Sequence, residues 1–152
     1  MTMKDDHELT VTRVIDAPRE LIFTLFTDPK HLDKWWGAGN MHAQTAHMNA
    51  KTGGSWEYEM KIGSGKSFPN YITYKEIQRP EKIVYSYTND KSTPEDQKPL
   101  TVILLSDLDG KTKLDITLIF PSDIQFDNFI PGAVRGLNGN LDSLEEYLKK
   151  ID

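Results

Sequence analysis

The order of hydrophobic periodicities along the chain is the feature that most limits its fold. A stretch of alternating apolar and polar residues, 8–15, is followed by two stretches with helical spacing between residues 16 and 37. Strand-like runs return from about residue 41 to 120, and helical spacing resumes after Pro121. Because period two indicates strands and period 3.6 indicates helices, we predict strand, two helices, a long antiparallel meander and one long C-terminal helix. That order is typical of the α+β class.

The middle of the chain contains the clearest strand signals. In "SWEYEMKI", residues 55–62, the apolar side chains of Trp56, Tyr58 and Met60 alternate with charged ones, so one face of this strand is expected in the core. Asp109-Gly110 separates two further apolar runs and predicts a tight hairpin. In total we expect about six or seven strands.

Two short consecutive helices are predicted directly after the first strand. Pro18 and Pro29 suit the first turns of these helices, and Gly37 suits the end of the second. Two adjacent tryptophans, Trp35 and Trp36, close the second helix. We expect one of them to fix the short helices onto the sheet and the other to reach toward the mouth of a cavity.

The C-terminal helix carries an apolar stripe from Val134 through Leu137 and Leu141 to Leu148, at spacings of three and four residues. A sheet of about six or seven strands is ~30 Å wide, whereas one helix is only ~10–12 Å across. The helix alone is therefore too narrow to cover the sheet. Either the sheet curls around the helix, or the short helices complete the cover and space remains. Such a space is a natural place for a ligand.

The candidate pocket residues are large side chains on the expected inner surface. Tyrosine and tryptophan combine an apolar body with one polar group, which suits a pocket that encloses and orients a ligand. The alternative is that each of them packs the core. The predicted lining residues are Trp36, Trp56, Tyr58, Met60, Tyr71, Tyr85, Tyr87, Leu104, Phe120, Phe129, Val134, Leu137 and Leu141.

Charge, composition and motifs argue against several other functions. The net charge of −5 disfavours nucleic acid and anionic membranes as partners, and no apolar run is long enough for membrane insertion. The absence of cysteine fits a reducing cytoplasm. His42 and His47 are expected on opposite faces of a strand, so we predict no metal site there. Gly65-Lys66-Ser67 matches only the end of a phosphate-binding loop, and we predict a hairpin turn.

No catalytic constellation is visible in the sequence. Glu57 and Glu59 share a strand face, but we expect that face to be solvated, without the desolvation that a catalytic carboxylate needs. No G-x-S-x-G motif for a serine nucleophile occurs. Cyclase-type chemistry that depends on cavity shape and a hydrogen bond from a tyrosine or Arg13 stays open.

Four segments, taken in order, resemble the domain of activator of heat-shock-protein-90 ATPase homologues. They are "DAPRELIFTLFTDPKHLDKWWG", "GGSWEYEM", "EIQRPEKIVYSY" and "GLNGNLDSLEEYL". That family belongs to the START-like (SRPBCC) superfamily, and the resemblance extends from about Leu9 to Leu148. It implies a helix-grip fold, in which a curved antiparallel sheet wraps around the long C-terminal helix and encloses an apolar pocket. Relatives of this fold bind lipids, sterols or polyketides, and some are cyclases.

The residues and the resemblance together predict one START-like domain over residues 1–152 that binds a small hydrophobic or amphipathic molecule. A cyclase- or hydrolase-type enzyme in the same cavity is one alternative. A stress-related, co-chaperone-like interaction domain with a weak protein partner is the other. We expect no cofactor and no metal, a cytoplasmic location, and a monomer or homodimer.

Overall fold

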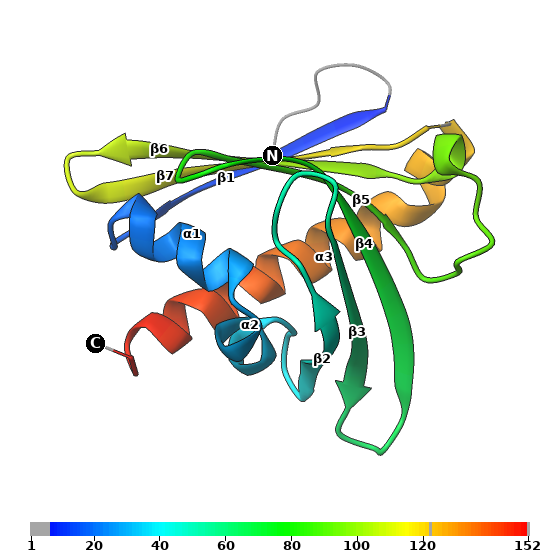
Figure 1. Ribbon diagram of the computed structural model, residues 1–152, viewed down its shortest axis with the longest axis horizontal. Coiled ribbons are helices and arrows are strands. Elements are labelled where there is room, and N and C mark those ends of the chain that lie inside the picture. The colour runs from blue at the N-terminus through cyan, green and yellow to red at the C-terminus, as the bar shows by residue number, and fades with distance from the viewer. Residues whose placement is uncertain (1–6, 122, 152) are drawn as a thin grey trace.

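A computed structural model describes residues 7–121 and 123–151, and for residues 123–129 only the backbone. In this part of the chain seven strands form one antiparallel sheet in the order β1-β7-β6-β5-β4-β3-β2 (Figure 1). The strands are β1 (Glu8–Ile15), β2 (Met41–Met48), β3 (Ser55–Ile62), β4 (Ser67–Gln78), β5 (Lys82–Thr88), β6 (Leu100–Leu108) and β7 (Lys111–Ile119). The helices are α1 (Arg19–Thr27), α2 (Pro29–Trp35) and α3 (Asp123–Leu148), with a 3-10 turn at Glu95–Gln97. The predicted order of elements is confirmed.

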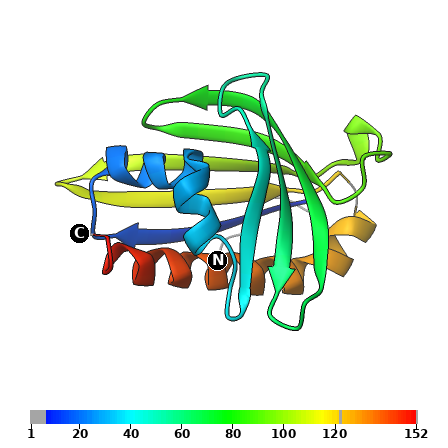
Figure 2. The ribbon, with the colours of Figure 1, turned by 60° about the horizontal axis from the view of Figure 1, so that its bottom comes forward.

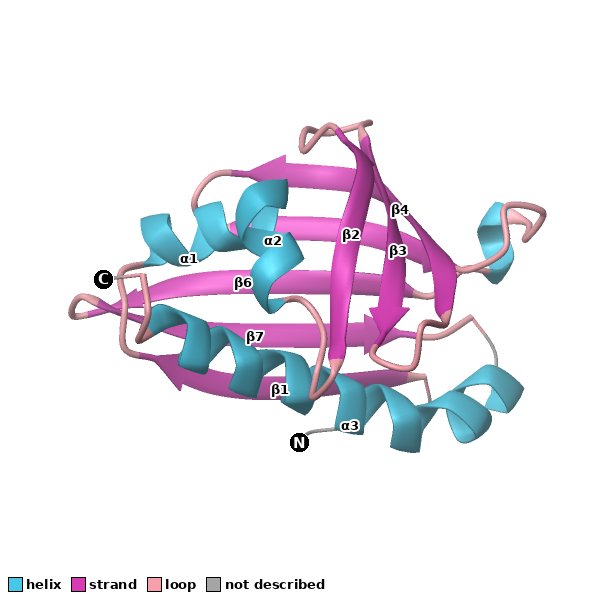
Figure 3. Ribbon diagram, turned by 90° about the horizontal axis from the view of Figure 1, so that it is seen from below, coloured by secondary structure: helices cyan, strands magenta, loops and turns pink. Residues whose placement is uncertain are grey.

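The sheet bends so strongly that its two halves run in different directions. In Figure 3, β2, β3 and β4 cross the direction of β6, β7 and β1, and all three helices lie on the same face of the sheet. Register shifts between Thr45 and His47 in β2 and between Tyr74 and Glu76 in β4 mark irregularities of the bulge type, which bend strands. Figure 2 shows α1 and α2 beside α3. Curling of the sheet and the short helices therefore both contribute to covering the inner face.

The irregularity in β2 corrects the predicted orientation of two histidines. His42 is opposite Lys61, and His47 is opposite Glu57, which share one face of β3. Both histidines therefore lie on the outer face, not on opposite faces, because the extra residue at the bulge reverses the alternation. Among the residues that the structure describes, no group of three or more His, Asp or Glu side chains could hold a metal ion.

Two tight turns join neighbouring strands as the sequence predicts. Asp109 and Gly110 have φ angles of 53° and 88°, so both central residues of the β6–β7 turn are left-handed, as a type I′ turn requires. Gly65, with φ 92°, lies in the turn between β3 and β4. The segment around Lys66 is thus a hairpin turn, and the prediction against a phosphate-binding loop is confirmed.

Two hydrophobic clusters fill the inner face. The main cluster includes Trp35, Leu141 and Leu144, which are 2%, 1% and 0% exposed. The second cluster is small and consists of Leu9 and Phe120 with partly buried neighbours. Those neighbours are Leu118 of β7 and Ile130, Ala133 and Val134 of α3. The second half of α3 therefore packs on the main cluster, and the described part of its first half contributes to the second.

Trp35 fixes the two short helices to each other, whereas the sequence predicts that one tryptophan fixes them onto the sheet. Its indole Nε1 donates to the carbonyl oxygen of Leu25 at 2.9 Å. Its ring meets that of Phe26 edge-on, with centroids 5.0 Å apart. Asp28 caps α2 by accepting from the backbone N–H of Lys30 at 2.9 Å. The helix pair is thus held by packing, by a buried hydrogen bond and by a cap.

The second half of α3 is bonded to the connection between α2 and β2. The backbone N–H of Gly37 donates to Asn140 Oδ1 at 3.0 Å, and Ser143 Oγ donates to the Gly37 carbonyl at 2.8 Å. Gly139 lies directly against Ala38, since a Cβ at Gly139 would be only 2.6 Å from that of Ala38. This close approach requires glycine and fixes where the helix crosses the connection.

Arg13 adds a second attachment between α3 and the sheet. It lies on the edge strand β1 and donates to Asp142 Oδ1 at 2.8 Å and to Asn138 Oδ1 at 3.1 Å. Arg13 therefore lies at the edge of the sheet and is paired with two side chains of α3.

The glycines of α3 allow a direct test of this packing. We predict that Gly132→Ala and Gly136→Ala each raise the free energy of unfolding by up to ~1 kcal/mol, because an added Cβ meets no atom within 4 Å at either position. Gly139→Ala should lower it, because the new methyl collides with Ala38. Urea unfolding followed by circular dichroism gives the three values. Equal stabilisation by all three substitutions would contradict the close approach at Gly139.

Candidate ligand-binding site

Aromatic side chains form a continuous surface on the inner face of the sheet. Trp56 and Tyr58 of β3 stack with ring centroids 4.1 Å apart, and Trp36 meets Trp56 edge-on at 5.7 Å. Tyr74 of β4 and Tyr85 of β5 meet edge-on at 6.3 Å. This aromatic wall, defined by these five residues, spans three strands and the end of α2.

The polar atoms of the tryptophans in the wall are all satisfied. Trp36 Nε1 donates to the hydroxyl of Tyr58 at 3.0 Å, and Trp56 Nε1 donates to Thr45 Oγ1 at 3.0 Å. The Thr45 hydroxyl in turn donates to Asp33 Oδ1 at 2.6 Å. Because a buried indole N–H without a partner is costly, these bonds fix the orientation of both rings.

A small void lies within the aromatic wall. Its volume is about 10 Å³. It is lined by Phe26, Leu32, Trp36, Trp56, Tyr74, Ile83, Tyr85 and Ile103. A cavity needs about 10–15 Å³ of space for the centre of a water-sized sphere to hold one water molecule. The void therefore has room for a single water. This void is thus far smaller than the ligand-sized space expected from the sequence.

The contact between the inner face and α3, which we call the seam, is closed in one half and looser in the other. Leu141 and Leu144 of α3 are buried in the main cluster. The inner side chains that stay partly exposed along the rest of the seam are Tyr85, Tyr87, Leu118, Val134 and Leu137. We call these five residues the open half of the seam. It lies between the two hydrophobic clusters, because Leu118 packs against both.

A buried polar pair borders the open half. Asn70 of β4 is 3% exposed and is opposite Tyr58 in the register, which puts it on the inner face. Its Oδ1 accepts a hydrogen bond from the Tyr87 hydroxyl at 2.5 Å, and its Nδ2 donates to the Phe68 carbonyl at 3.2 Å. Sequence reasoning missed Asn70, although its place two residues before the buried Ile72 is a usable signal.

Burial raises the pKa of every tyrosine hydroxyl on the inner face. Desolvation is the largest cause for Tyr58, Tyr74, Tyr85 and Tyr87, and it raises the pKa of Tyr85 to about 12. A hydrogen bond from Trp36 lowers the pKa of Tyr58 but is outweighed by burial. These hydroxyls are therefore neutral at physiological pH, where they can donate and accept hydrogen bonds.

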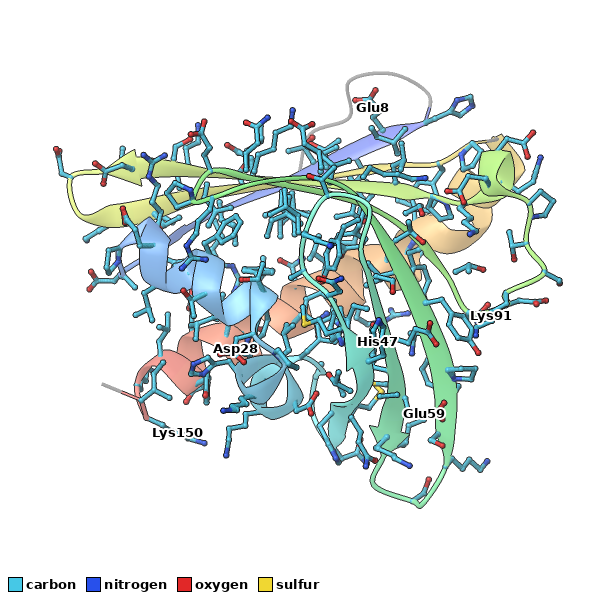
Figure 4. The ribbon with its side chains drawn as sticks, in the orientation of Figure 1. Glu8, Asp28, His47, Glu59, Lys91 and Lys150 are labelled. Atoms are coloured by element: carbon cyan, nitrogen blue, oxygen red, sulfur yellow. The ribbon has the colours of Figure 1, made fainter. Side chains whose placement is uncertain are left out.

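Two predicted pocket residues lie on the wrong face. Tyr71 is on the outer face of β4, where the ammonium of Lys91 lies 5.0 Å from its ring centroid; Figure 4 labels Lys91. Leu104 is 41% exposed and is opposite Lys82 and Asp115 in the register. Both predictions are wrong because the sequences around these residues contain large side chains at successive positions, so their alternation does not identify the inner face.

The remaining predicted residues are distributed over the interior. Met60 is inner and 8% exposed, and Phe120 belongs to the second cluster. Leu141 is a core residue in the closed half of the seam. The side chain of Phe129 lies outside the described residues. Trp36, the second member of the tryptophan pair, lines the void.

Sequence comparison then identifies the chain. The family model described as Activator of Hsp90 ATPase homolog 1-like protein matches residues 16–149. The chain belongs to this family. No curated protein sequence matches it.

Solved structures of proteins from several organisms share the fold. A protein from Nitrosomonas europaea superposes with a TM-score of 0.86 over 100% of both chains at 19% identity. One from Arthrobacter aurescens gives 0.87 over 97% of this chain and 90% of its own, at 19% identity. An HSP90 activator from Plasmodium falciparum gives 0.55 over 76% and 74%, at 22% identity. The predicted START-like helix-grip fold is thereby confirmed.

No helix in the described part of the chain is long and apolar enough to cross a membrane.

The raised tyrosine pKa values predict how stability depends on alkaline pH. A tyrosine whose folded pKa exceeds its unfolded value of about 10 stabilises the fold fully below that value. This stabilisation is lost as pH rises through the folded pKa, which is about 12 for Tyr85. We expect the free energy of unfolding to fall above about pH 10, by roughly 1.4 kcal/mol per pH unit for each buried tyrosine.

Urea unfolding monitored by tryptophan fluorescence at a series of alkaline pH values measures this fall. Tyr85→Phe removes one titrating hydroxyl and should make the fall shallower, whereas Tyr71→Phe on the outer face is the matched control. An identical fall in wild type and Tyr85→Phe would contradict the assignment.

Proposed function

We propose that the domain binds a small apolar or amphipathic molecule in the open half of the seam. The observation that carries the proposal is that three inner-face side chains, Tyr85, Tyr87 and Leu118, are only partly buried, as are Val134 and Leu137 of α3. These five side chains face the interior of the fold but remain partly exposed to solvent. A ligand that covers them removes apolar surface from water, which is favourable by about 25 cal/mol per Å².

The void near Trp56 holds about one water, so a ligand that extends into it enters as α3 moves away from the sheet. Three side chains in the described part of α3 bind to the segment that contains α2 and Gly37. Asn140 and Ser143 are bonded to Gly37, and the Tyr147 hydroxyl lies 2.7 Å from His31 Nδ1. All three belong to the second half of the helix. The described residues of the first half pack mainly in the small second cluster.

An interaction domain for a protein partner has less support from the described surface. Its exposed large apolar side chains are Val14, Leu21, Phe68, Leu104 and Leu108. Polar neighbours separate them: Val14 is opposite Lys113, and Leu104 is opposite Lys82 and Asp115. Scattered single apolar residues are normal on protein surfaces, and an interface is usually marked by a contiguous patch. The Plasmodium relative is an HSP90 activator, so a heat-shock ATPase is the partner with which to test this alternative.

An enzyme in the same position would have to work with neutral tyrosines. Burial keeps the hydroxyls of Tyr74 and Tyr85 protonated, so they can donate hydrogen bonds to a substrate but are poor general bases near neutral pH. Arg13, the other group considered for a cyclase, is bonded to Asp142 and Asn138. Ligand binding is therefore the function that the geometry supports best.

Filling the open half tests the proposal directly. The uncharged fluorophore N-phenyl-1-naphthylamine, which brightens in apolar surroundings, should bind the wild-type protein. Leu137→Trp adds a large side chain at a partly exposed inner position and should weaken binding by about tenfold. Leu104→Trp makes the same change on the outer face and should leave binding unchanged. Equal binding by all three proteins, or no binding by the wild type, would contradict the proposal.

A further inference from the structure

The pair formed by Asn70 and Tyr87 has unused hydrogen-bonding capacity. A carboxamide has two N–H donors and an oxygen with two lone pairs. The Phe68 carbonyl takes one donor, and the Tyr87 hydroxyl occupies one lone pair. The Tyr87 oxygen, having donated its proton to Asn70, can still accept. The pair can thus both donate to and accept from one further uncharged polar group.

Arg13 on the inner face and Lys91 on the outer face both lie away from this pair. Arg13 is on β1, three strands from β5 in the sheet order, which corresponds to roughly 14 Å at ordinary strand spacing. Its guanidinium is already paired with Asp142 at 2.8 Å and lies 3.9 Å from Glu145. Lys91 is on the outer face, 3.6 Å from Glu57. A carboxylate brought next to Asn70 would therefore have no free cation beside it among these residues.

The surroundings of the pair also disfavour an anion. Tyr58 is opposite Asn70 in the register, and Trp56 and Met60 follow on the same face of β3. Burial raises the pKa of the Tyr58 and Tyr87 hydroxyls, so desolvation already disfavours the charged form of groups that belong to the protein. A ligand carboxylate in the same place meets the same penalty.

We infer that the open half of the seam selects uncharged amphipathic molecules that carry a hydroxyl, carbonyl or amide group, and discriminates against carboxylates of the same length. The uncharged polar group bonds to Asn70 and Tyr87, and the apolar part lies against the aromatic wall. This inference rests on the proposed function, because it names the chemical class of molecule that the same site takes.

Three probes with the same carbon chain test the selectivity: decanamide, decanol and decanoate. Each is titrated against the wild-type protein loaded with N-phenyl-1-naphthylamine at about pH 8, where a carboxylic acid is ionised. Decanamide and decanol should displace the fluorophore at concentrations about tenfold lower than decanoate. Displacement by decanoate at the same or lower concentration would overturn the inference while leaving the proposed function intact. Failure of the fluorophore to bind at all would overturn both.

A variant pair tests the role of the polar pair itself. Tyr87→Phe keeps the ring but removes the hydroxyl, so it should weaken decanamide binding by about fivefold more than it changes fluorophore binding. Tyr71→Phe removes a hydroxyl from the outer face of β4 and should change neither. If Tyr87→Phe leaves decanamide binding unaltered, or if it weakens the fluorophore equally, the assignment of the polar group to Asn70 and Tyr87 is overturned.

Discussion

The attachment of the second half of α3 is the constraint on which the rest of the structure depends. Gly139 lies against Ala38 so closely that no side chain fits between them, and Asn140 and Ser143 hold both polar groups of the Gly37 backbone. These contacts fix where the helix crosses the sheet. The main core forms beneath this half of the helix, and among the described residues the small second cluster lies beneath the first half of α3.

The unequal attachment of α3 links the fold to the proposed function. A narrow helix over a broad sheet leaves surface uncovered, and in this conformation the uncovered part is a looser seam with a water-sized void. A ligand there would cover side chains that are less buried than Leu141 and Leu144. A polar side chain in an apolar interior is costly unless its hydrogen bonds are satisfied. Besides its bond to Tyr87, the buried Asn70 can bind the polar group of such a ligand.

The sequence predicts those parts of the fold that depend on local patterns. The alternation in residues 55–62, the turn at Asp109-Gly110 and the apolar stripe of the last helix are all read correctly, because each depends on residues close in the chain. The site is predicted less well. Tyr71 and Leu104 are wrongly predicted on the inner face, because large side chains at successive positions hide the alternation. The predicted face of His47 is wrong because an irregularity in β2 shifts the alternation by one residue. The size of the void depends on how side chains from distant segments meet, which no local pattern contains.

Hydrogen–deuterium exchange along α3 tests the central claim most directly. If the helix is held mainly by its second half, amides of residues 140–148 should exchange more slowly than those of residues 130–138. Binding of N-phenyl-1-naphthylamine should then slow exchange in residues 130–138 and leave the second half unchanged. Uniform protection along residues 130–148, with no change when the fluorophore is added, would contradict both the unequal attachment and the ligand site built on it.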